Sequence, residues 1–228
     1  MGCPFKANGL YSRMRVGAVL LAAGAGLRLG GRPKALLELG GVPLVMRQLI
    51  ALSGAGVDEV VVVLGHYADE IEAAIAHLPI TVVRNPEPER GRASSVRLGL
   101  QALSPSVDAI VVTPADMPLV GADDVVALIA AYRKRGEARM VVPRVTAAAG
   151  GAAQPGNPLI FDAALRDAWL AGDADLACRR WREQHPLDVR WLDTDNRRYR
   201  IDIDTPEDLA AFERDTGHRL SWPAEALR

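Results

Sequence analysis

Two patterns of apolar positions alternate along this chain. Short continuous apolar runs, typical of strands buried on both faces, are separated by segments with the apolar spacing of amphipathic helices. Strands joined by helices need crossover connections, so the pattern predicts an α/β fold, a Rossmann-like three-layer α/β/α arrangement around a mostly parallel sheet. The predicted strands are residues 16–22, 59–64, 80–83, 109–113, 140–145, 159–161, 189–192 and 199–203. The predicted helices are residues 43–52, 68–77, 94–103, 123–134, 162–170 and 176–184.

The domain organisation is predicted to be simple. The chain has 228 residues and contains neither an internal repeat nor a segment that demands a domain boundary. We expect a disordered lead over residues 1–15, one domain over residues 16–216 and a C-terminal tail over residues 217–228.

Composition narrows the class of partner. The net charge is -1 and aromatic residues make up 5% of the chain, which argues against binding to nucleic acid or to an anionic membrane surface. No apolar run approaches the roughly 20 residues needed to cross a bilayer, and the start lacks the apolar core of a secretory signal. The cysteines and histidines have no metal-ligand spacing. A cytoplasmic protein acting on small molecules is expected.

The first predicted strand ends in a glycine-rich loop that also carries cations. Gly24, Gly26 and the pair at 30–31 lie among Arg28, Arg32 and Lys34. Glycine lets a backbone approach a ligand closely, and successive exposed N–H groups form a concavity that suits an anion. Cations in the same loop indicate a heavily charged ligand such as a nucleoside triphosphate, although a plain turn is the alternative interpretation.

Two familiar nucleotide motifs do not fit this loop. The dinucleotide fingerprint needs glycines at its first, third and sixth positions, and Leu29 occupies the sixth. The second strand also ends without an acidic residue for a ribose. A Walker A motif needs Gly-Lys-Ser or Gly-Lys-Thr, which the chain lacks. An NAD-dependent enzyme is therefore disfavoured.

Two aspartates follow predicted strands and are candidate ligands for a metal ion. Asp116 comes after strand 109–113, where a carboxylate can hold Mg²⁺ that bridges to phosphates. Strand alternation places Asp202 and Asp204 on one face. Thr205 and Asp208 are explained as a helix capping box, whereas Asp204 has no such explanation. A cap or turn role for Asp116, and an arginine partner for Asp202, are the alternatives.

Two further loops follow or precede strands. The segment from Asn85 through Gly91 leads into a helix expected to be capped by Ser94 or Ser95, with Arg92 or Arg97 nearby, which would suit an anion. The segment from Gln154 to residue 161 places the amide of Asn157 beside prolines. A capped surface helix and a simple turn are the respective alternatives.

Together these motifs resemble the MobA-like nucleotidyltransferases, most closely the molybdenum cofactor cytidylyltransferase (MocA-like) branch. The resemblance covers residues 16–212, and the chain departs from that branch at residues 172–179, where Asp175 replaces a glycine and the arginine is displaced. The matching motifs are Leu21-Ala-Ala-Gly24-Ala-Gly26-Leu-Arg28-Leu-Gly30 with Lys34, Asp116-Met117-Pro118, Gly156-Asn157-Pro158 and Asp202-Ile-Asp204-Thr-Pro-Glu-Asp-Leu209.

The resemblance implies a nucleotide-diphospho-sugar-transferase-like fold and a Mg²⁺-dependent transfer of NMP, with CTP as the expected donor and molybdopterin or its metal-loaded cofactor as the first acceptor. Arg28, Lys34 and Asp116 would be catalytic, Asp116 and Asp204 would hold the metal, and Gly156, Asn157 and Asp202 would contact the acceptor. A molybdoenzyme or its maturation factor would be the macromolecular partner. The expected nucleotide contacts are Leu21, Ala22, Ala23, Gly24, Ala25, Gly26, Arg28, Lys34, Asn85, Gly91, Ser95 and Asp116.

Other functions are compatible with the same motifs. A sugar- or polyol-phosphate nucleotidyltransferase using UTP or CTP, and a GTP-using molybdopterin guanylyltransferase, would share the loop. A non-catalytic chaperone of the molybdenum cofactor would bind the cofactor without releasing pyrophosphate.

Overall fold

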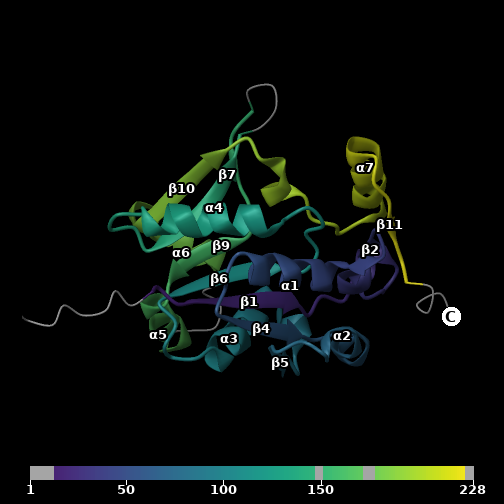
Figure 1. The fold of residues 1–228 in the computed structure, drawn as a ribbon, viewed down its shortest axis with the longest axis horizontal. Coiled ribbons are helices and arrows are strands. Elements are labelled where there is room, and N and C mark those ends of the chain that lie inside the picture. Colours follow the sequence, from purple (N-terminus) through teal and green to yellow (C-terminus); the bar gives the residue numbers. More distant parts are fainter. Residues whose placement is uncertain (1–12, 147–150, 172–177, 224–228) are drawn as a thin grey trace, which may run out of the picture.

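The computed structural model describes residues 13–146, 151–171 and 178–223. Its main sheet consists of β1 (Val16–Ala22), β4 (Glu59–Leu64), β5 (Thr81–Arg84), β6 (Ala109–Pro114), β7 (Met140–Val145), β8 (Gln154–Pro155), β9 (Leu159–Asp162) and β10 (Val189–Thr194). The spatial order is β10-β7-β9-β6-β1-β4-β5 (Figure 1). β8 pairs with β7 outside this path.

The sheet is mostly parallel, as the alternation of strands and helices predicts. β1 lies at its centre and pairs in parallel with β4 and β6, with Val19 opposite Val61 and Val112. β9 is antiparallel to both β6 and β7, and β8 is antiparallel to β7. The carboxyl ends of β1, β4, β5 and β6 therefore meet at one edge, where ligands bind in sheets of this kind.

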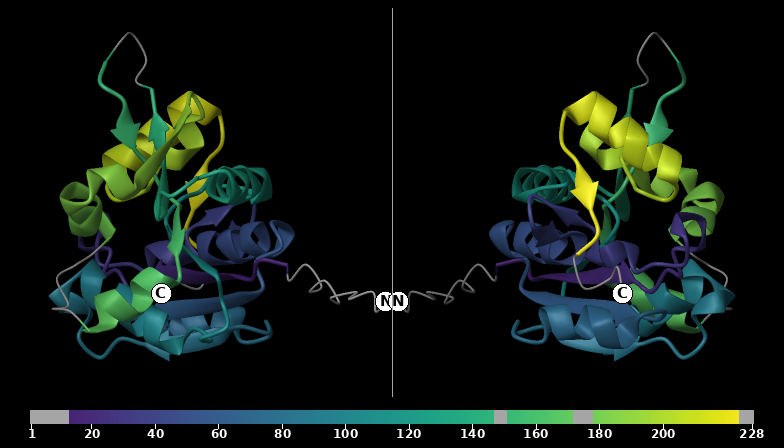
Figure 2. Two further views of the ribbon diagram at one scale, coloured as in Figure 1. Left: turned by 90° about the vertical axis from the view of Figure 1, so that its left-hand side faces the viewer. Right: turned by 90° about the vertical axis from the view of Figure 1, so that its right-hand side faces the viewer.

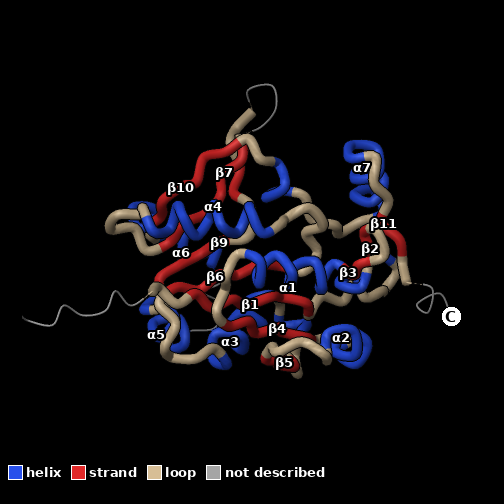
Figure 3. The backbone as a smooth tube through the Cα atoms, viewed as in Figure 1, coloured by secondary structure: helices blue, strands red, loops and turns tan. Residues whose placement is uncertain are grey.

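Helices cover both faces of the sheet (Figure 3). They are α1 (Leu44–Gly54), α2 (Ala68–Ile75), α3 (Arg92–Ala102), α4 (Ala122–Arg133), α5 (Ala164–Ala171), α6 (Cys178–Gln184) and α7 (Pro206–Thr216). Val19 of β1 packs in a cluster with α3, α5 and α6, whereas its neighbours Ala18 and Leu20 pack toward α1, α2 and α4. The three-layer α/β/α class is confirmed.

A small second sheet lies beside α7. It pairs β2 (Glu38–Leu39) with β3 (Val42–Pro43) and with β11 (Leu220–Ser221), near the C-terminal end of the chain (Figure 2). Phe212 of α7 and Leu220 of β11 share an apolar cluster with Leu29, which lies within the glycine-rich loop, and Leu37, which follows it. The described part of the segment expected to be a tail is thus packed against the domain.

Three expectations about elements are wrong in detail. Residues 199–203 form no strand: Arg197–Arg200 is a 3₁₀ turn begun by the Asn196 side chain, which accepts from Arg198 N at 3.2 Å. The strand expected at 80–83 lies one residue later, at Thr81–Arg84. Neither Ser94 nor Ser95 caps α3, because Gly91, with φ 93°, lets the helix begin at Arg92.

The limits of the remaining helices agree with expectation within a few residues. The helix expected from residue 176 is described from Cys178 onward, because residues 176–177 lie outside the described part. Among the described residues, every helix is too short or too polar to span a bilayer.

Candidate active site

Two aspartates far apart in the sequence meet at one ammonium group. Asp116 follows β6 and is 5% exposed. Lys34 Nζ donates to Asp116 Oδ2 and, over 2.7 Å, to Asp204 Oδ1. Arg28 Nη2 lies 3.0 Å from Asp204 Oδ2. The glycine-rich loop, the end of β6 and the start of α7 thus converge at the carboxyl edge of the sheet.

Backbone contacts fix the position of Asp204. The N–H groups of Asp204 and Thr205 donate to Asp208 Oδ2 at 2.9 and 2.8 Å, and Asp208 N donates back to Thr205 Oγ1 at 3.2 Å. This is the predicted capping box, and it is confirmed. Ile203 N donates to the carbonyl of Asp116 at 3.0 Å, which ties the two aspartate segments together.

Lys34 and Asp204 favour each other's ionised forms. Burial alone would lower the pKa of Lys34, but the charges and hydrogen bonds of Asp116 and Asp204 together outweigh burial, and the pKa is raised. Burial would likewise raise the pKa of Asp204, but the hydrogen bond and charge of Lys34 lower it. Partial desolvation, together with the charges of Asp116 and Asp204, raises the pKa of Asp202.

One oxygen of the cluster has no partner. Asp116 Oδ1 is buried and accepts no hydrogen bond from any described residue. A buried acceptor left unpaired is costly unless a ligand satisfies it. The described residues contain no group of three or more His, Cys, Asp or Glu side chains that could hold a metal ion by themselves. Two carboxylates fit Mg²⁺, which is usually held by one or two carboxylates together with substrate phosphates.

A cavity of about 220 Å³ adjoins this cluster, between the glycine-rich loop and the start of α3. Pro88, Arg92 and Pro114 complete its wall. The expected nucleotide-contact residues that line it are Leu21, Ala23, Gly24, Lys34, Gly91, Ser95 and Asp116.

The other expected nucleotide-contact residues do not line that cavity. Ala22 is buried in the core, and Arg28 lies exposed against Asp204. A Cβ on Gly26 would lie 2.1 Å from the carbonyl of Arg32, so Gly26 shapes the loop. Ala25 accepts a hydrogen bond through its carbonyl. Asn85 uses its side chain to donate to Ser94 and Ser95, both at 2.9 Å.

A second cavity, of about 550 Å³, shares Leu21, Arg92 and Pro114 with the first. The three residues expected to contact the acceptor, Gly156, Asn157 and Asp202, all line it. Sequence reasoning did not assign a role to the other cations in its wall. The cavity is also lined by Arg179, Arg182 and Arg200, and by the aliphatic residues Val96, Val112 and Leu159.

A signal for two of those cations was available. Arg179 and Arg182 are three residues apart on a predicted helix and so share one face. The arginines noted near α3 behave differently from one another. Arg97 donates to the carbonyl of Leu170 at 2.7 Å, which directs it away from the cavities, whereas Arg92 lines both.

Comparison with known proteins identifies the family. The MobA-like NTP transferase domain matches residues 18–189. The chain belongs to the MobA-like NTP transferase family. This MobA-like chain is 33% identical to the nicotine blue oxidoreductase of Paenarthrobacter nicotinovorans over 202 residues, covering 85% of the chain and 94% of that protein. It is 40% identical to the 2-C-methyl-D-erythritol 4-phosphate cytidylyltransferase of Streptomyces coelicolor over 161 residues, covering 64% of the chain and 58% of that protein.

Solved structures of similar proteins share the fold of this MobA-like chain. Rv0371c from Mycobacterium tuberculosis H37Rv superimposes with a TM-score of 0.73 at 27% identity, over 87% of the chain and 96% of that structure. A nucleotidyl transferase from Methanothermobacter superimposes with a TM-score of 0.68 at 25% identity, over 88% of the chain and 97% of that structure. The expected nucleotide-diphospho-sugar-transferase-like fold is confirmed.

Proposed function

We propose that this MobA-like protein is a nucleotidyltransferase that transfers an NMP group from an NTP onto a phosphorylated small-molecule acceptor and releases pyrophosphate. CTP is the donor that we propose first. The observation that carries the proposal is the pair of adjoining cavities. The Lys34 and Asp116 side chains line the first, and Leu21, Arg92 and Pro114 form a wall common to both. A donor and an acceptor held in these cavities would meet at that wall.

The residues present suit this chemistry. Phosphoryl-type transfer needs alignment and charge neutralisation more than a protein nucleophile. Here an acceptor phosphate oxygen would bond to the α-phosphorus of the NTP while the bond to the pyrophosphate oxygen breaks. The acceptor phosphate needs no general base because its second pKa is about 6. Lys34 and Arg28 would neutralise charge on the departing pyrophosphate, and the backbone at Ala23 and Gly24 would approach the nucleotide.

The metal is part of the proposal. Asp116, through its unpaired Oδ1, and Asp204 would hold Mg²⁺ together with phosphate oxygens. When bound, the ion would orient the phosphates and offset their charge. A structure of Rv0371c is described as a complex with manganese, which supports a divalent cation in a protein of this fold.

The acceptor we propose first is molybdopterin or its metal-loaded cofactor. The second cavity combines an aliphatic side with four arginines, Arg92, Arg179, Arg182 and Arg200, which outnumber the acidic residues in its wall, Glu183 and Asp202. Such a surface suits a partly apolar, anionic molecule better than a small polyol phosphate. The likeness to a cytidylyltransferase of a polyol phosphate supports CTP and keeps that smaller acceptor as the alternative. A molybdoenzyme or its maturation factor, in the cytoplasm, would receive the product.

Pyrophosphate release tests the proposal. The purified protein is incubated with each of the four NTPs and Mg²⁺, with molybdopterin, with a panel of polyol and sugar phosphates, or with no acceptor. We expect pyrophosphate with CTP and molybdopterin, and none from Asp116→Asn, which keeps the side-chain shape and removes the charge. Release only with a polyol phosphate or with GTP would replace the acceptor or the base. Binding of molybdopterin without release from any NTP would favour the chaperone.

One relative favours a second candidate function. The protein that this chain matches over 94% of its length is named an oxidoreductase. The chain itself lacks the sixth-position glycine of a dinucleotide site, which is Leu29. Oxidation of NADH or NADPH with nicotine blue as the acceptor, followed without any NTP, separates the two candidates. Turnover of the reduced nicotinamide together with absence of pyrophosphate release would establish the oxidoreductase.

A further inference from the structure

Tyr67 holds an unusual backbone conformation next to the candidate active site. It precedes α2 with φ 58°, and it is the one non-glycine residue with positive φ among those that the structure describes. A bulky side chain in this left-handed region carries an energetic cost, and such strain is found where a particular side chain is required. We therefore infer that the contacts of the Tyr67 hydroxyl account for a tyrosine at this position.

The Tyr67 hydroxyl contacts both ends of the glycine-rich turn. It donates to the carbonyl of Gly31, and the carbonyl of Ala25 lies 3.4 Å from the same oxygen. The adjoining backbone approaches the same loop, because His66 N lies 3.4 Å from the carbonyl of Ala23. A Cβ on Gly65 would lie 2.9 Å from that carbonyl, so the turn at 65–67 rests directly on the loop.

The segment between the two contacted carbonyls carries a catalytic candidate. Leu27–Leu29 is a 3₁₀ turn flanked by Gly26 and Gly30, both in the left-handed region, and it presents Arg28 to Asp204. Glycines give such a segment many alternative conformations. A contact from outside the segment is needed to hold one of them before a ligand binds.

We propose that Tyr67 is a positioning residue: its hydroxyl fixes the turn from Ala25 to Gly31 so that Arg28 and the loop backbone are in place when the triphosphate arrives. The part that concerns the triphosphate rests on the proposed function. The part that concerns the order of the loop does not.

Tyr67→Phe tests the proposal, because phenylalanine keeps the ring and the backbone conformation and removes only the hydroxyl. Calorimetry of CTP binding without acceptor should show an affinity about tenfold weaker, the equivalent of about 1.4 kcal/mol. The KM for CTP should rise in step, with kcat and the KM for the acceptor within about twofold of the wild type. Amide hydrogen exchange over residues 25–31 should be faster in the variant.

Tyr199→Phe is the matched control. Its hydroxyl donates to the carbonyl of Asp124 at 2.8 Å, away from the glycine-rich loop, so its loss should lower thermal stability and leave CTP affinity unchanged. Unchanged exchange at residues 25–31 in Tyr67→Phe would overturn the proposal. So would equal loss of CTP affinity in both variants. If the wild type binds no NTP, the proposed function fails, and hydrogen exchange alone decides the role of Tyr67.

Discussion

Lys34 is the residue on which the charges of the site depend. Its ammonium group contacts both Asp116 and Asp204, and its side chain is 18% exposed. A partly buried cation of this kind can stabilise charge that develops on a phosphate in the transition state, where it has greater effect than in water.

Removing the side chain of either Lys34 or Asp116 should lower the turnover number. For Lys34→Ala and Asp116→Ala we expect kcat to fall by about 10²–10³, the range for loss of one transition-state charge contact. Steady-state kinetics with saturating CTP and acceptor measures this, and circular dichroism checks that each variant is folded. Wild-type turnover in both variants would contradict the assigned roles, even with the fold intact.

Asp204 should make stability depend on pH. Its pKa is lowered in the folded protein, so the stabilisation is present above the ordinary aspartate pKa of about 4 and is lost as pH falls through the lower, folded value. We expect Asp204→Asn to be less stable than the wild type by on the order of 1 kcal/mol at pH 7. Urea denaturation at a series of pH values should show this difference shrinking below pH about 4. A constant difference would mean that the carboxylate charge is not responsible.

At the level of elements, the position of α3 is set by a close contact with the sheet. α3 brings Gly91 and Arg92 to the first cavity, and Gly99 in its third turn faces β1. A Cβ on Gly99 would lie 2.3 Å from Val19 Cγ1, a distance that requires the helix or the strand to move.

Gly99→Ala should therefore destabilise the protein although alanine favours helices. Overpacking of a core typically costs about 1–3 kcal/mol, more than the helix propensity gained. Gly121→Ala is the control, because the nearest atom to its Cβ would be 3.9 Å away. Chemical denaturation compares the two. Equal stability of Gly99→Ala and wild type would show that α3 shifts freely.

The elements that sequence predicts best are the strands buried on both faces. β1 and β4 have the predicted limits because a nearly continuous apolar run of that length is typical of the interior of such a sheet. β7 also has its predicted limits, although Arg144 interrupts its apolar run. The alternation Ile201, Asp202, Ile203 wrongly predicted a strand. A single hydrogen bond, from Ile203 N to the Asp116 carbonyl, holds this segment and gives it the burial pattern of a strand. The predicted start of α3 at a capping serine is wrong because the helix begins after Gly91, whose backbone conformation replaces a serine cap.

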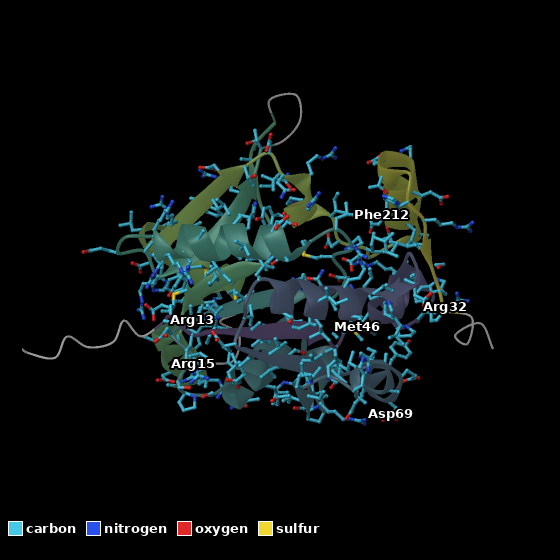
Figure 4. The ribbon with its side chains drawn as sticks, in the orientation of Figure 1. Arg13, Arg15, Arg32, Met46, Asp69 and Phe212 are labelled. Atoms are coloured by element: carbon cyan, nitrogen blue, oxygen red, sulfur yellow. The ribbon has the colours of Figure 1, made fainter. Side chains whose placement is uncertain are left out.

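At the scale of the whole molecule, the site lies where the chain's distant parts meet. The sequence predicts that Asp116 and Asp204 converge, but the expected strand before Asp204 is absent: Asp116 follows β6, and the hydrogen bond from Ile203 N to the Asp116 carbonyl brings Asp204 to the same edge of the sheet. Tyr67 and Arg200 could not be predicted as part of the site. The position of each side chain depends on how the turn that carries it packs against a loop from a distant part of the sequence. In Figure 4, Arg32 of the loop and Phe212 of α7 lie at the end of the molecule opposite Arg13 and Arg15.

Phe212 links the C-terminal part of the chain to this end. It is 3% exposed and packs in the cluster that contains Leu29 and Leu220. Phe212→Ala should cost about 3–5 kcal/mol, as large-to-small changes in cores do, and should weaken CTP binding because Leu29 loses support. Val126→Ala, at a position 47% exposed, should change neither. Denaturation and calorimetry measure both effects. Loss of stability with unaltered affinity would separate α7 from the nucleotide site.

The Lys34 ammonium between the two aspartates affects how nucleotide binding depends on ionic strength. With Arg28 it balances both carboxylates within the protein, so these four side chains add no excess charge to the first cavity, and Arg92 is the other cation in its wall. An incoming polyanion would exchange partners inside an already neutral cluster and displace few counterions from solution. Added salt should therefore weaken nucleotide binding less steeply than the number of nearby cations alone suggests.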